Sequence, residues 1–424
     1  MHVCYKIVRG IVISKNNDVK EIIALANSLG FEIVQTFIQK RENTTPYYIG
    51  VGKLKEIKNF VDENEIEIAF INDELKPSQW YNLEDFLKIK VYDRIRLILE
   101  VFADRANRKE AKLQVKLAKL RYEKPFVREL IHRLKEKERP GFLAGGEYLV
   151  ADYYEMIKKQ MKKIKEELTK IEMERKIRRK DRRERGFYLV SIAGYTNAGK
   201  SSLLQLLTGE NVLVEERLFS TLSTTTSKIK DFKKYKPVLL TDTVGFIKDL
   251  PHWLIDAFHS TLEEIELADV VILLIDASDE IEELKKKTIT SIKELKKMEK
   301  HPETIIALNK IDLISKEELK EKKNVIKEMT GKECIAISVK NRENIGELIE
   351  KIYDTLPSEV EMEIYIPNHN HELIAWIYER ADVKEMESGK KIKMKVRCSE
   401  RIAKMVEGKC KKAGGEVRLN GREN

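Results

Sequence analysis

One short segment constrains the fold of this chain more than any other: GYTNAGKS, from Gly194 to Ser201. It matches the pattern G-x-x-x-x-G-K-[ST] and lies between an apolar run, FYLVSIA, and residues that read as a helix from about Lys200. The glycines let the backbone curl around a phosphate, the lysine supplies a cation to the phosphate oxygens, and the serine hydroxyl can bind Mg²⁺. A strand, a phosphate loop and a helix in this order predict an α/β nucleotide-binding domain.

The apolar runs that follow Gly186 place this loop in a larger sheet. The runs FYLVSIA, VLL, VVILLI, TIIAL and CIAI alternate with helical stretches, and most of them lead directly into a polar or glycine motif. This order is typical of a doubly wound sheet that binds ligands at the carboxyl ends of its strands. We predict that this domain covers residues 187–357.

Two further motifs identify the ligand. The run VLLTD ends at Asp242, which we expect to hold Mg²⁺ through water, and Gly245 can offer its amide to a γ-phosphate. In NKID (Asn309–Asp312), the Asp312 carboxylate can accept both N–H donors of guanine, which adenine does not present. Asp242 could instead be a turn residue, but its place after an apolar strand favours the functional interpretation. Together the motifs predict a GTP-binding switch domain.

A hydroxyl-rich stretch, FSTLSTTTSK (residues 219–228), lies between the first two motifs. A switch loop needs one threonine that reaches Mg²⁺ when the γ-phosphate is present. We predict Thr225 for this role, with Thr224 and Thr226 as competitors, and a solvated loop is the alternative interpretation. The predicted metal ligands are therefore Ser201, Thr225 and Asp242.

The predicted nucleotide contacts come from the phosphate loop, the D-x-x-G loop, NKID and the stretch SVK that follows CIAI. They are Gly194, Tyr195, Thr196, Asn197, Ala198, Gly199, Lys200, Ser201, Ser202, Asp242, Gly245, Asn309, Lys310, Asp312, Ser338, Val339 and Lys340. One position departs from expectation. Many nucleotide hydrolases place a water-orienting glutamine after the glycine of D-x-x-G, and here that position holds Phe246.

Residues 1–104 are predicted to form another parallel α/β domain. Short apolar runs, VCYKIVRGIVI, FEIVQTFI, EIEIAFI and IKVYD, alternate with helical stretches. In YYIGVGK, Gly50 and Gly52 come just before a helix, where backbone amides could meet an anion. We prefer a plain turn, because two glycines lack the spacing of a dinucleotide or phosphate-loop fingerprint.

Residues 105–186 are predicted to form an antiparallel helical hairpin with a basic end. The apolar positions of the second helix give way to basic ones at Arg175 and Arg178. Residues 157–186 hold 14 Lys or Arg against six Asp or Glu, so this segment carries most of the net charge of +9. A solvated helix end is one interpretation, but the concentration of charge favours a surface that faces a polyanion. The apolar positions of the two helices are Leu113, Leu117 and Leu120, then Tyr154, Ile157, Met161, Ile164, Leu168 and Ile171.

The rest of the chain adds a small α+β domain, residues 358–424, with strands EMEIYIP and KIKMKVR and helices around His371–Ala381 and Ala403–Ala413. The four cysteines form neither a C-x-x-C pair nor a zinc pattern, which indicates a reducing compartment. No run approaches the roughly 20 apolar residues of a membrane span, and the start does not read as a signal peptide. We expect a monomeric cytoplasmic protein without a membrane span, part of it peripheral to a membrane.

Several stretches together resemble the HflX family of translation-associated GTPases. The similarity lies in YIGVGK, KLQVKLAKLRY, GYTNAGKSSLL, TDTVGFIKDLP and LIDAFHSTLEEIELAD, and it extends over most of residues 1–357. The resemblance implies a GTPase that binds GTP and GDP with Mg²⁺, binds the large ribosomal subunit near its catalytic RNA, and splits or rescues ribosomes. One departure is the loop GFLAGGEY, which is shorter than the glycine-rich loop common in the family, so contacts of that loop do not carry over.

The resemblance extends to GTPases with a hydrophobic residue after the D-x-x-G glycine, some of which hold K⁺ with a phosphate-loop asparagine. Asn197 matches that asparagine. Such a cation would stabilise charge between the β- and γ-phosphates, which implies K⁺ as a second cofactor. The predicted catalytic groups are then Lys200, Thr225, Gly245 and Asn197, with slow hydrolysis that the ribosome accelerates.

Two other classes of function stay open at this point. The chain could be an RNA-binding or ribosome-assembly factor whose GTPase only times its occupancy. A lipid-linked or small-molecule G protein has less support, because the sequence shows no lipidation motif and no amphipathic membrane helix.

Overall fold

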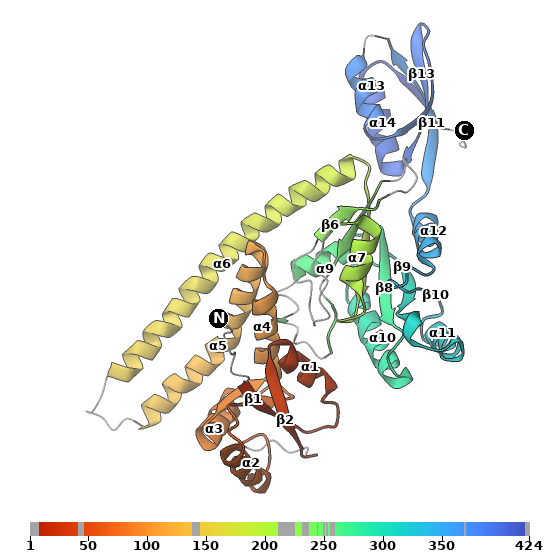
Figure 1. The fold of residues 1–424 in the computed structure, drawn as a ribbon. Helices are drawn as coiled ribbons and strands as arrows, with labels where there is room; N and C mark the ends of the chain where they lie inside the picture. The colour runs from red at the N-terminus through yellow and green to blue at the C-terminus, as the bar shows by residue number, and fades with distance from the viewer. Residues whose placement is uncertain are drawn as a thin grey trace, which may run out of the picture. The chain divides into compact units, whose positions relative to one another are not determined.

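The computed structural model describes residues 8–40, 46–137, 145–210, 225–230, 237–243, 245–248, 251, 253–254, 259–368 and 370–419 (Figure 1). The chain forms two compact units, the first built on residues up to Ile171 and the second on residues from Glu172 onward. The short segment around Trp253 groups with the first unit. No helix in the described ranges is long and apolar enough to cross a membrane.

The first unit begins with a four-stranded parallel sheet in the order β2-β1-β3-β4. The four strands confirm the predicted runs: β1 (Val8–Ser14), β2 (Phe31–Ile38), β3 (Ile68–Ile71) and β4 (Lys90–Asp93). The helices between them are α1 (Lys20–Ser28), α2 (Val51–Glu63) and α3 (Pro77–Leu87). Gly50 caps α2, and its N–H donates to Gln39 Oε1 at 2.8 Å, so this amide has a partner inside the protein.

A helix that was not predicted lies between this sheet and the hairpin. A helix, α4 (Arg94–Arg105), follows β4 directly, and the hairpin helix α5 (Lys109–Lys137) starts only after a break. Helix α4 gives little amphipathic pattern in the sequence because residues around much of its circumference are buried, among them Leu97, Ile98 and Leu99. Asp93 starts it, accepting a bond from the Arg96 amide at 2.8 Å.

Helices α5 and α6 (Gly145–Glu184) form the predicted antiparallel hairpin (Figure 1). Helix α6 begins at Gly145, earlier than the predicted Leu149, and the first part of GFLAGGEY lies outside the described residues. The predicted seam is confirmed at nearly every position. Its packed side chains are Leu113, Leu117, Leu120, Val127 and Ile131 of α5 with Tyr154, Ile157, Met161, Ile164 and Leu168 of α6.

The second unit contains a six-stranded sheet in the order β10-β9-β8-β5-β7-β6. Its strands are β5 (Tyr188–Gly194), β6 (Thr225–Lys228), β7 (Val238–Asp242), β8 (Val270–Asp276), β9 (Glu303–Asn309) and β10 (Cys334–Ala336), and only the edge strand β6 is antiparallel. The helices are α7 (Lys200–Thr208), α9 (His259–Glu266), α10 (Ile281–Lys296), α11 (Lys316–Thr330) and α12 (Ile345–Thr355). Separate apolar clusters, one with α7 and α12 and one with α9, α10 and α11, confirm the doubly wound architecture.

The chain continues into an antiparallel sheet in the order β12-β13-β11-β14, packed against two helices. The elements are β11 (Glu359–Pro367), α13 (His371–Tyr378), β12 (Asp382–Glu387), β13 (Lys391–Ser399), α14 (Glu400–Lys412) and β14 (Glu416–Leu419). The predicted strands EMEIYIP and KIKMKVR are confirmed as parts of β11 and β13, along which buried residues alternate mostly with partly buried ones. The sequence analysis missed β12 and β14, because these edge strands are mostly polar and largely exposed.

Candidate nucleotide-binding site

The phosphate loop has the backbone conformation that its sequence predicts. Gly194 and Gly199 have φ of +146° and +94°, and a side chain at either position would collide with the Leu274 carbonyl or the Asn309 amide group. Asn197 also lies in the left-handed region, with φ of +64°. Asparagine adopts this conformation more readily than most residues, so Asn197 has a backbone role in addition to any role of its side chain.

Lys200 begins α7 and is buried at the centre of this loop. Its Nζ donates to the Tyr195 carbonyl at 2.7 Å. Burial lowers the pKa of Lys200 to about 8, against the opposing effect of the Asp242 carboxylate. Phosphate oxygens next to this ammonium would favour its charged form, so the pKa and nucleotide binding are coupled.

Ser201 and Asp242, two of the predicted metal ligands, lie next to each other. The Ser201 hydroxyl donates to Asp242 Oδ2 at 2.7 Å, and both residues are buried. A hydroxyl and a carboxylate are the hard oxygen ligands that Mg²⁺ uses together with nucleotide phosphates, so this pair fits that ion. When bound, Mg²⁺ would neutralise developing phosphate charge. In the strand ladder, Thr225 pairs with Asp242, while Thr224 lies outside the described residues.

The base-recognition motif is joined to the phosphate loop by one side chain. Asn309 Nδ2 donates to the Ala198 carbonyl at 2.9 Å, and Asn309 Oδ1 accepts from the Val339 amide at 3.1 Å. The Ser338 hydroxyl donates to Asp312 Oδ1 at 2.6 Å. The structure therefore brings NKID and SVK together with the phosphate loop. Ser202 lies in the first turn of α7, and Lys340, the last residue of SVK, is exposed.

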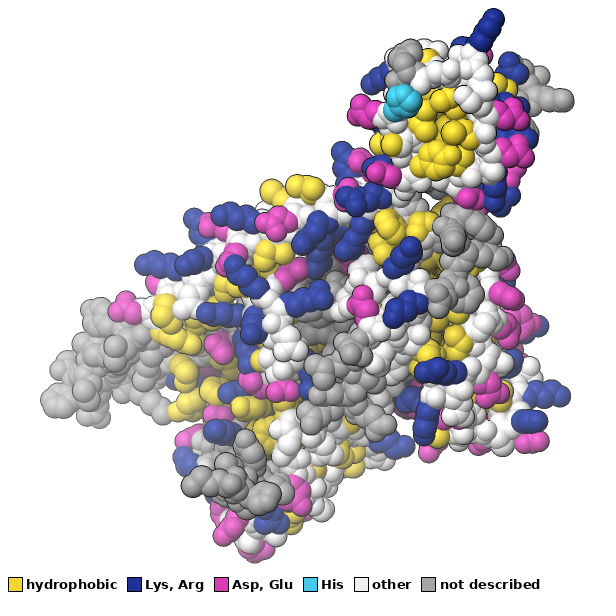
Figure 2. Space-filling model, turned by 45° about the horizontal axis from the view of Figure 1, so that its top comes forward, with side chains coloured by type: hydrophobic (Ala, Val, Ile, Leu, Met, Phe, Trp, Pro, Cys, Tyr) yellow, Lys and Arg dark blue, Asp and Glu magenta, His cyan; other side chains and the backbone are white. Residues whose placement is uncertain are grey.

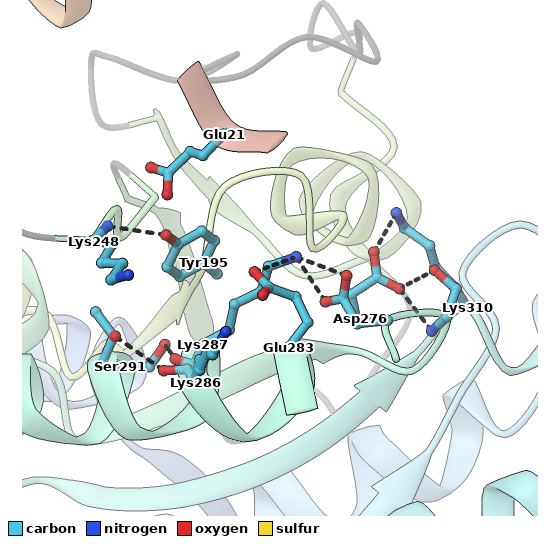
Figure 3. A network of polar contacts seen from close by, with 12 residues as sticks. Glu21, Tyr195, Lys248, Asp276, Glu283, Lys286, Lys287, Ser291 and Lys310 are labelled. Carbon is cyan, nitrogen blue, oxygen red and sulfur yellow. Dashed lines mark hydrogen bonds and ion pairs between the residues drawn. The ribbon is translucent and has the colours of Figure 1, made fainter. Parts of the chain in front are cut away.

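A polar network beside the phosphate loop was missed by the sequence analysis (Figure 3). Lys310 Nζ contacts Asp276 Oδ2 at 2.6 Å, and Lys287 Nζ of α10 contacts Asp279 Oδ1 at 2.7 Å. The Lys287 ammonium also lies 5.5 Å from the centre of the Tyr195 ring. In the stretch LLIDASD, Asp276 is the last residue of β8 and Asp279 lies three residues after it. Polar residues at the end of an apolar run are the sequence signal that predicted the other ligand loops, and it was available here too.

The D-x-x-G loop lies directly against the phosphate loop. The Phe246 amide donates to the Gly194 carbonyl and the Thr196 amide donates to the Phe246 carbonyl, both at 3.0 Å. Gly245 is required here, because a Cβ would lie 2.8 Å from Lys200 Nζ and 2.9 Å from Thr196 Cα. The Lys248 amide donates to the Tyr195 hydroxyl at 2.9 Å (Figure 3).

The side chain of Phe246, at the position where many nucleotide hydrolases have glutamine, is buried. It is only 5% exposed and packs in the apolar cluster that includes Tyr195, Ile265 and Leu273. In this conformation its ring is part of the domain core. The residue therefore anchors the loop, and its side chain has no polar atom that could orient water.

A phosphate loop, a D-x-x-G loop and an N-K-x-D motif at the carboxyl end of a doubly wound sheet define a P-loop GTPase. Comparisons with known proteins narrow this class. The family descriptions "GTP-binding GTPase N-terminal", "GTP-binding GTPase Middle Region", "50S ribosome-binding GTPase" and "HflX C-terminal domain" match residues 16–103, 105–182, 189–310 and 324–416. The chain belongs to the HflX family of GTPases, and it hydrolyses GTP with Mg²⁺-dependent nucleotide binding.

Individual relatives agree with this assignment. The chain is 39% identical to the GTPase HflX of Thermococcus kodakarensis over 414 residues, which is 94% of this chain and 92% of that protein. It is 41% identical to the GTPase HflX of Thermofilum pendens over 343 residues, 80% of each protein. Among solved structures, a GTP-binding protein of Sulfolobus solfataricus in complex with GDP has a TM-score of 0.46 at 28% identity, over 82% of this chain and 98% of that chain.

Proposed function

We propose that this GTPase associates with the large ribosomal subunit and its RNA in the GTP-bound form, and that it splits or rescues ribosomes. The family description "50S ribosome-binding GTPase" over residues 189–310 and the basic C-terminal part of α6 support the choice of partner. The observation that carries the proposal is the buried Phe246 ring. Phe246 has no polar side-chain atom that could orient water, so the attacking water would be positioned by the backbone or by a group of the ribosome.

The experiment compares ribosome profiles with and without the protein. Intact ribosomes are mixed with the protein and either GDP or a non-hydrolysable GTP analogue, then separated by sedimentation. We expect free subunits, with the protein on the large one, only with the GTP analogue. An assembly factor whose GTPase times occupancy would bind the large subunit but leave intact ribosomes whole, and no binding in either state would refute the proposed partner.

In the proposed reaction, Lys200 binds the β- and γ-phosphate oxygens, and the amide of Gly245 binds the γ-phosphate. Ser201 and Asp242 would hold Mg²⁺, the latter through water, and Thr225 would join them when the γ-phosphate is present. Thr225 is favoured over Thr226 by the strand register, since Thr225 pairs with Asp242 and Thr226 pairs with Thr241. Because cross-strand partners share a face of the sheet, Thr226 belongs to the face opposite Asp242.

We further propose that Asn197 holds K⁺ against the phosphates and so stabilises charge in the transition state. Asn197 is exposed on the phosphate loop, which leaves its amide oxygen accessible to an ion. The test is GTP turnover in KCl and in NaCl for the wild type and for Asn197→Gly. Glycine tolerates the φ of +64° but lacks the amide, so only the wild type should turn over faster in KCl. Equal wild-type rates in both salts would refute the role of K⁺.

A further inference from the structure

A hollow lined by cations lies where the end of α6 meets α9 and α14, away from the nucleotide site. It has a volume of about 560 Å³. The lining holds five cations and two carboxylates, with Leu267 and Met405 as its apolar part. The charged members are Lys176, Arg179, Lys180, Arg183 and Arg401, with Glu184 and Glu263.

The cations of α6 share one face of the helix. Lys176, Arg179, Lys180 and Arg183 follow the spacing of three and four residues that places side chains above one another. With a rise of 1.5 Å per residue, this row extends over roughly 10 Å. The sequence analysis expected the basic face at Arg175 and Arg178, but neither of these residues lines the hollow. A row of this length is longer than a single phosphate group, so it can contact several phosphates in a chain.

Two of the arginines are fixed in place by contacts inside the unit. Arg179 is 6% exposed and contacts Glu263 Oε2 at 2.8 Å. Arg183 donates to the Leu267 carbonyl at 2.6 Å, just beyond the last residue of α9. Guanidinium groups held this way lose less freedom when they bind an anion, because their positions are already set.

Arg183 and Arg401 lie close enough to affect each other. Burial, and after it the neighbouring Arg401 guanidinium, lowers the pKa of Arg183, while the Asp269 carboxylate acts in the opposite direction. Two like charges close together in a partly buried place repel each other, and an anion bound between them would relieve that repulsion. Arg401 itself is exposed, in the first turn of α14.

Gly186 allows this arrangement of elements. It has φ of +81°, and a Cβ there would lie 3.1 Å from the Arg380 carbonyl and 3.5 Å from Ile402. The end of α6 can therefore approach the start of α14 closely. Figure 2 shows Lys and Arg side chains gathered in the region of α6 on the face in view.

We propose that this hollow binds consecutive phosphates of an RNA backbone. The linear row of cations and the open, partly apolar shape fit a polyanion with ribose between its charges better than a compact ion. This inference rests on the proposed function, because the RNA in question would belong to the ribosome. It adds a specific anchoring surface outside the nucleotide site.

The test uses Lys180→Glu/Arg401→Glu, which changes two exposed cations that touch no part of the nucleotide site. Lys411→Glu/Lys412→Glu makes the same change of net charge at the other end of α14, on two exposed lysines, and is the matched control. Binding of a fluorescent oligouridylate is measured by anisotropy at several salt concentrations. We expect the double variant to bind at least about 10-fold more weakly, with a salt slope smaller by about 1.4, since two phosphate contacts are lost. The Lys411→Glu/Lys412→Glu control should bind as the wild type does.

Equal RNA affinity of the double variant and the control would refute the proposal. Displacement of the RNA by inorganic phosphate, but not by chloride at the same ionic strength, would also refute it, in favour of a small-anion site. Loss of binding to phosphatidylserine vesicles without loss of RNA binding would assign the surface to a membrane. Sedimentation of the wild type with large subunits tests the proposed function separately. If the wild type does not sediment with large subunits, but the double variant still binds RNA more weakly than the control, only the ribosomal partner is wrong.

Discussion

Replacing Phe246 with glutamine tests whether this side chain belongs to the core of the domain or faces the nucleotide. Glutamine is the residue that orients water at this position in many nucleotide hydrolases, so on sequence alone Phe246→Gln looks like a gain of catalytic function. The structure predicts a loss of stability instead. The Phe246 ring is 5% exposed inside an apolar cluster, and the backbone on both sides is held by bonds to the phosphate loop.

The magnitude follows from what the glutamine must replace. Burying a phenylalanine contributes about 1.5–3 kcal/mol, and a buried amide without partners costs a further 1–3 kcal/mol or so. We therefore expect Phe246→Gln to destabilise the GTPase domain by about 3–5 kcal/mol. At roughly 2–4 °C per kcal/mol for a domain of this size, the unfolding midpoint should fall by about 10 °C.

The assay is thermal unfolding with GDP bound, together with GTP turnover below the transition. Phe246→Leu is the control, because it keeps an apolar side chain and should cost less than about 1.5 kcal/mol. Turnover without a partner should stay within about twofold of the wild type in both variants, since neither supplies a water-orienting group at the γ-phosphate. A Phe246→Gln protein as stable as the wild type, with faster hydrolysis, would show that this side chain faces the nucleotide and that our reading is wrong.

Three further predictions concern the nucleotide site. Gly245→Ala should weaken binding of a GTP analogue by about 10-fold or more, because its Cβ would lie 2.8 Å from Lys200 Nζ; unchanged affinity in a fluorescent-nucleotide titration would contradict this. The pKa of Lys200 is lowered to about 8, so the ammonium of the free protein loses its proton as the pH rises through that value. Bound phosphates would favour the charged ammonium, so GDP binding above that pH should be weaker and should be accompanied by proton uptake. Calorimetry at pH near 8.5 in buffers of different ionisation enthalpy should give about 0.8 proton per GDP, and no uptake would refute the coupling. Asp312→Asn should lower GTP affinity by at least about 100-fold and favour a xanthine nucleotide, whose 2-oxo group can accept a bond from the new amide; retained GTP preference in a competition assay would contradict the base assignment.

Much of the fold could be predicted because its patterns are local. The strands that carry the nucleotide site are apolar runs that end in recognisable loops, and the hairpin seam repeats at fixed spacing. Helix α4 was missed because its buried residues leave no clear stripe, and β12 because an exposed edge strand needs little apolar alternation. These elements depend on contacts made by other parts of the chain.

The residues of the candidate site could be predicted from the sequence where they belong to motifs, but their contacts with one another could not. Motif spacing predicted Lys200, Ser201, Asp242 and the NKID residues, since the chemistry of phosphate and guanine demands those types. It did not predict that Asp276 holds Lys310, or that Phe246 is part of the core. The first depends on strand order, which places the ends of β8 and β9 side by side, and the second on the path of a loop.

The side-chain amide of Asn309 bonds at once to Ala198 of the phosphate loop and to Val339 of the base loop. Both bonds are made within the protein, so they do not depend on a bound base. If the nucleotide binds as proposed, its phosphates and its base would meet loops that are already held in position, so little conformational entropy would be lost on binding.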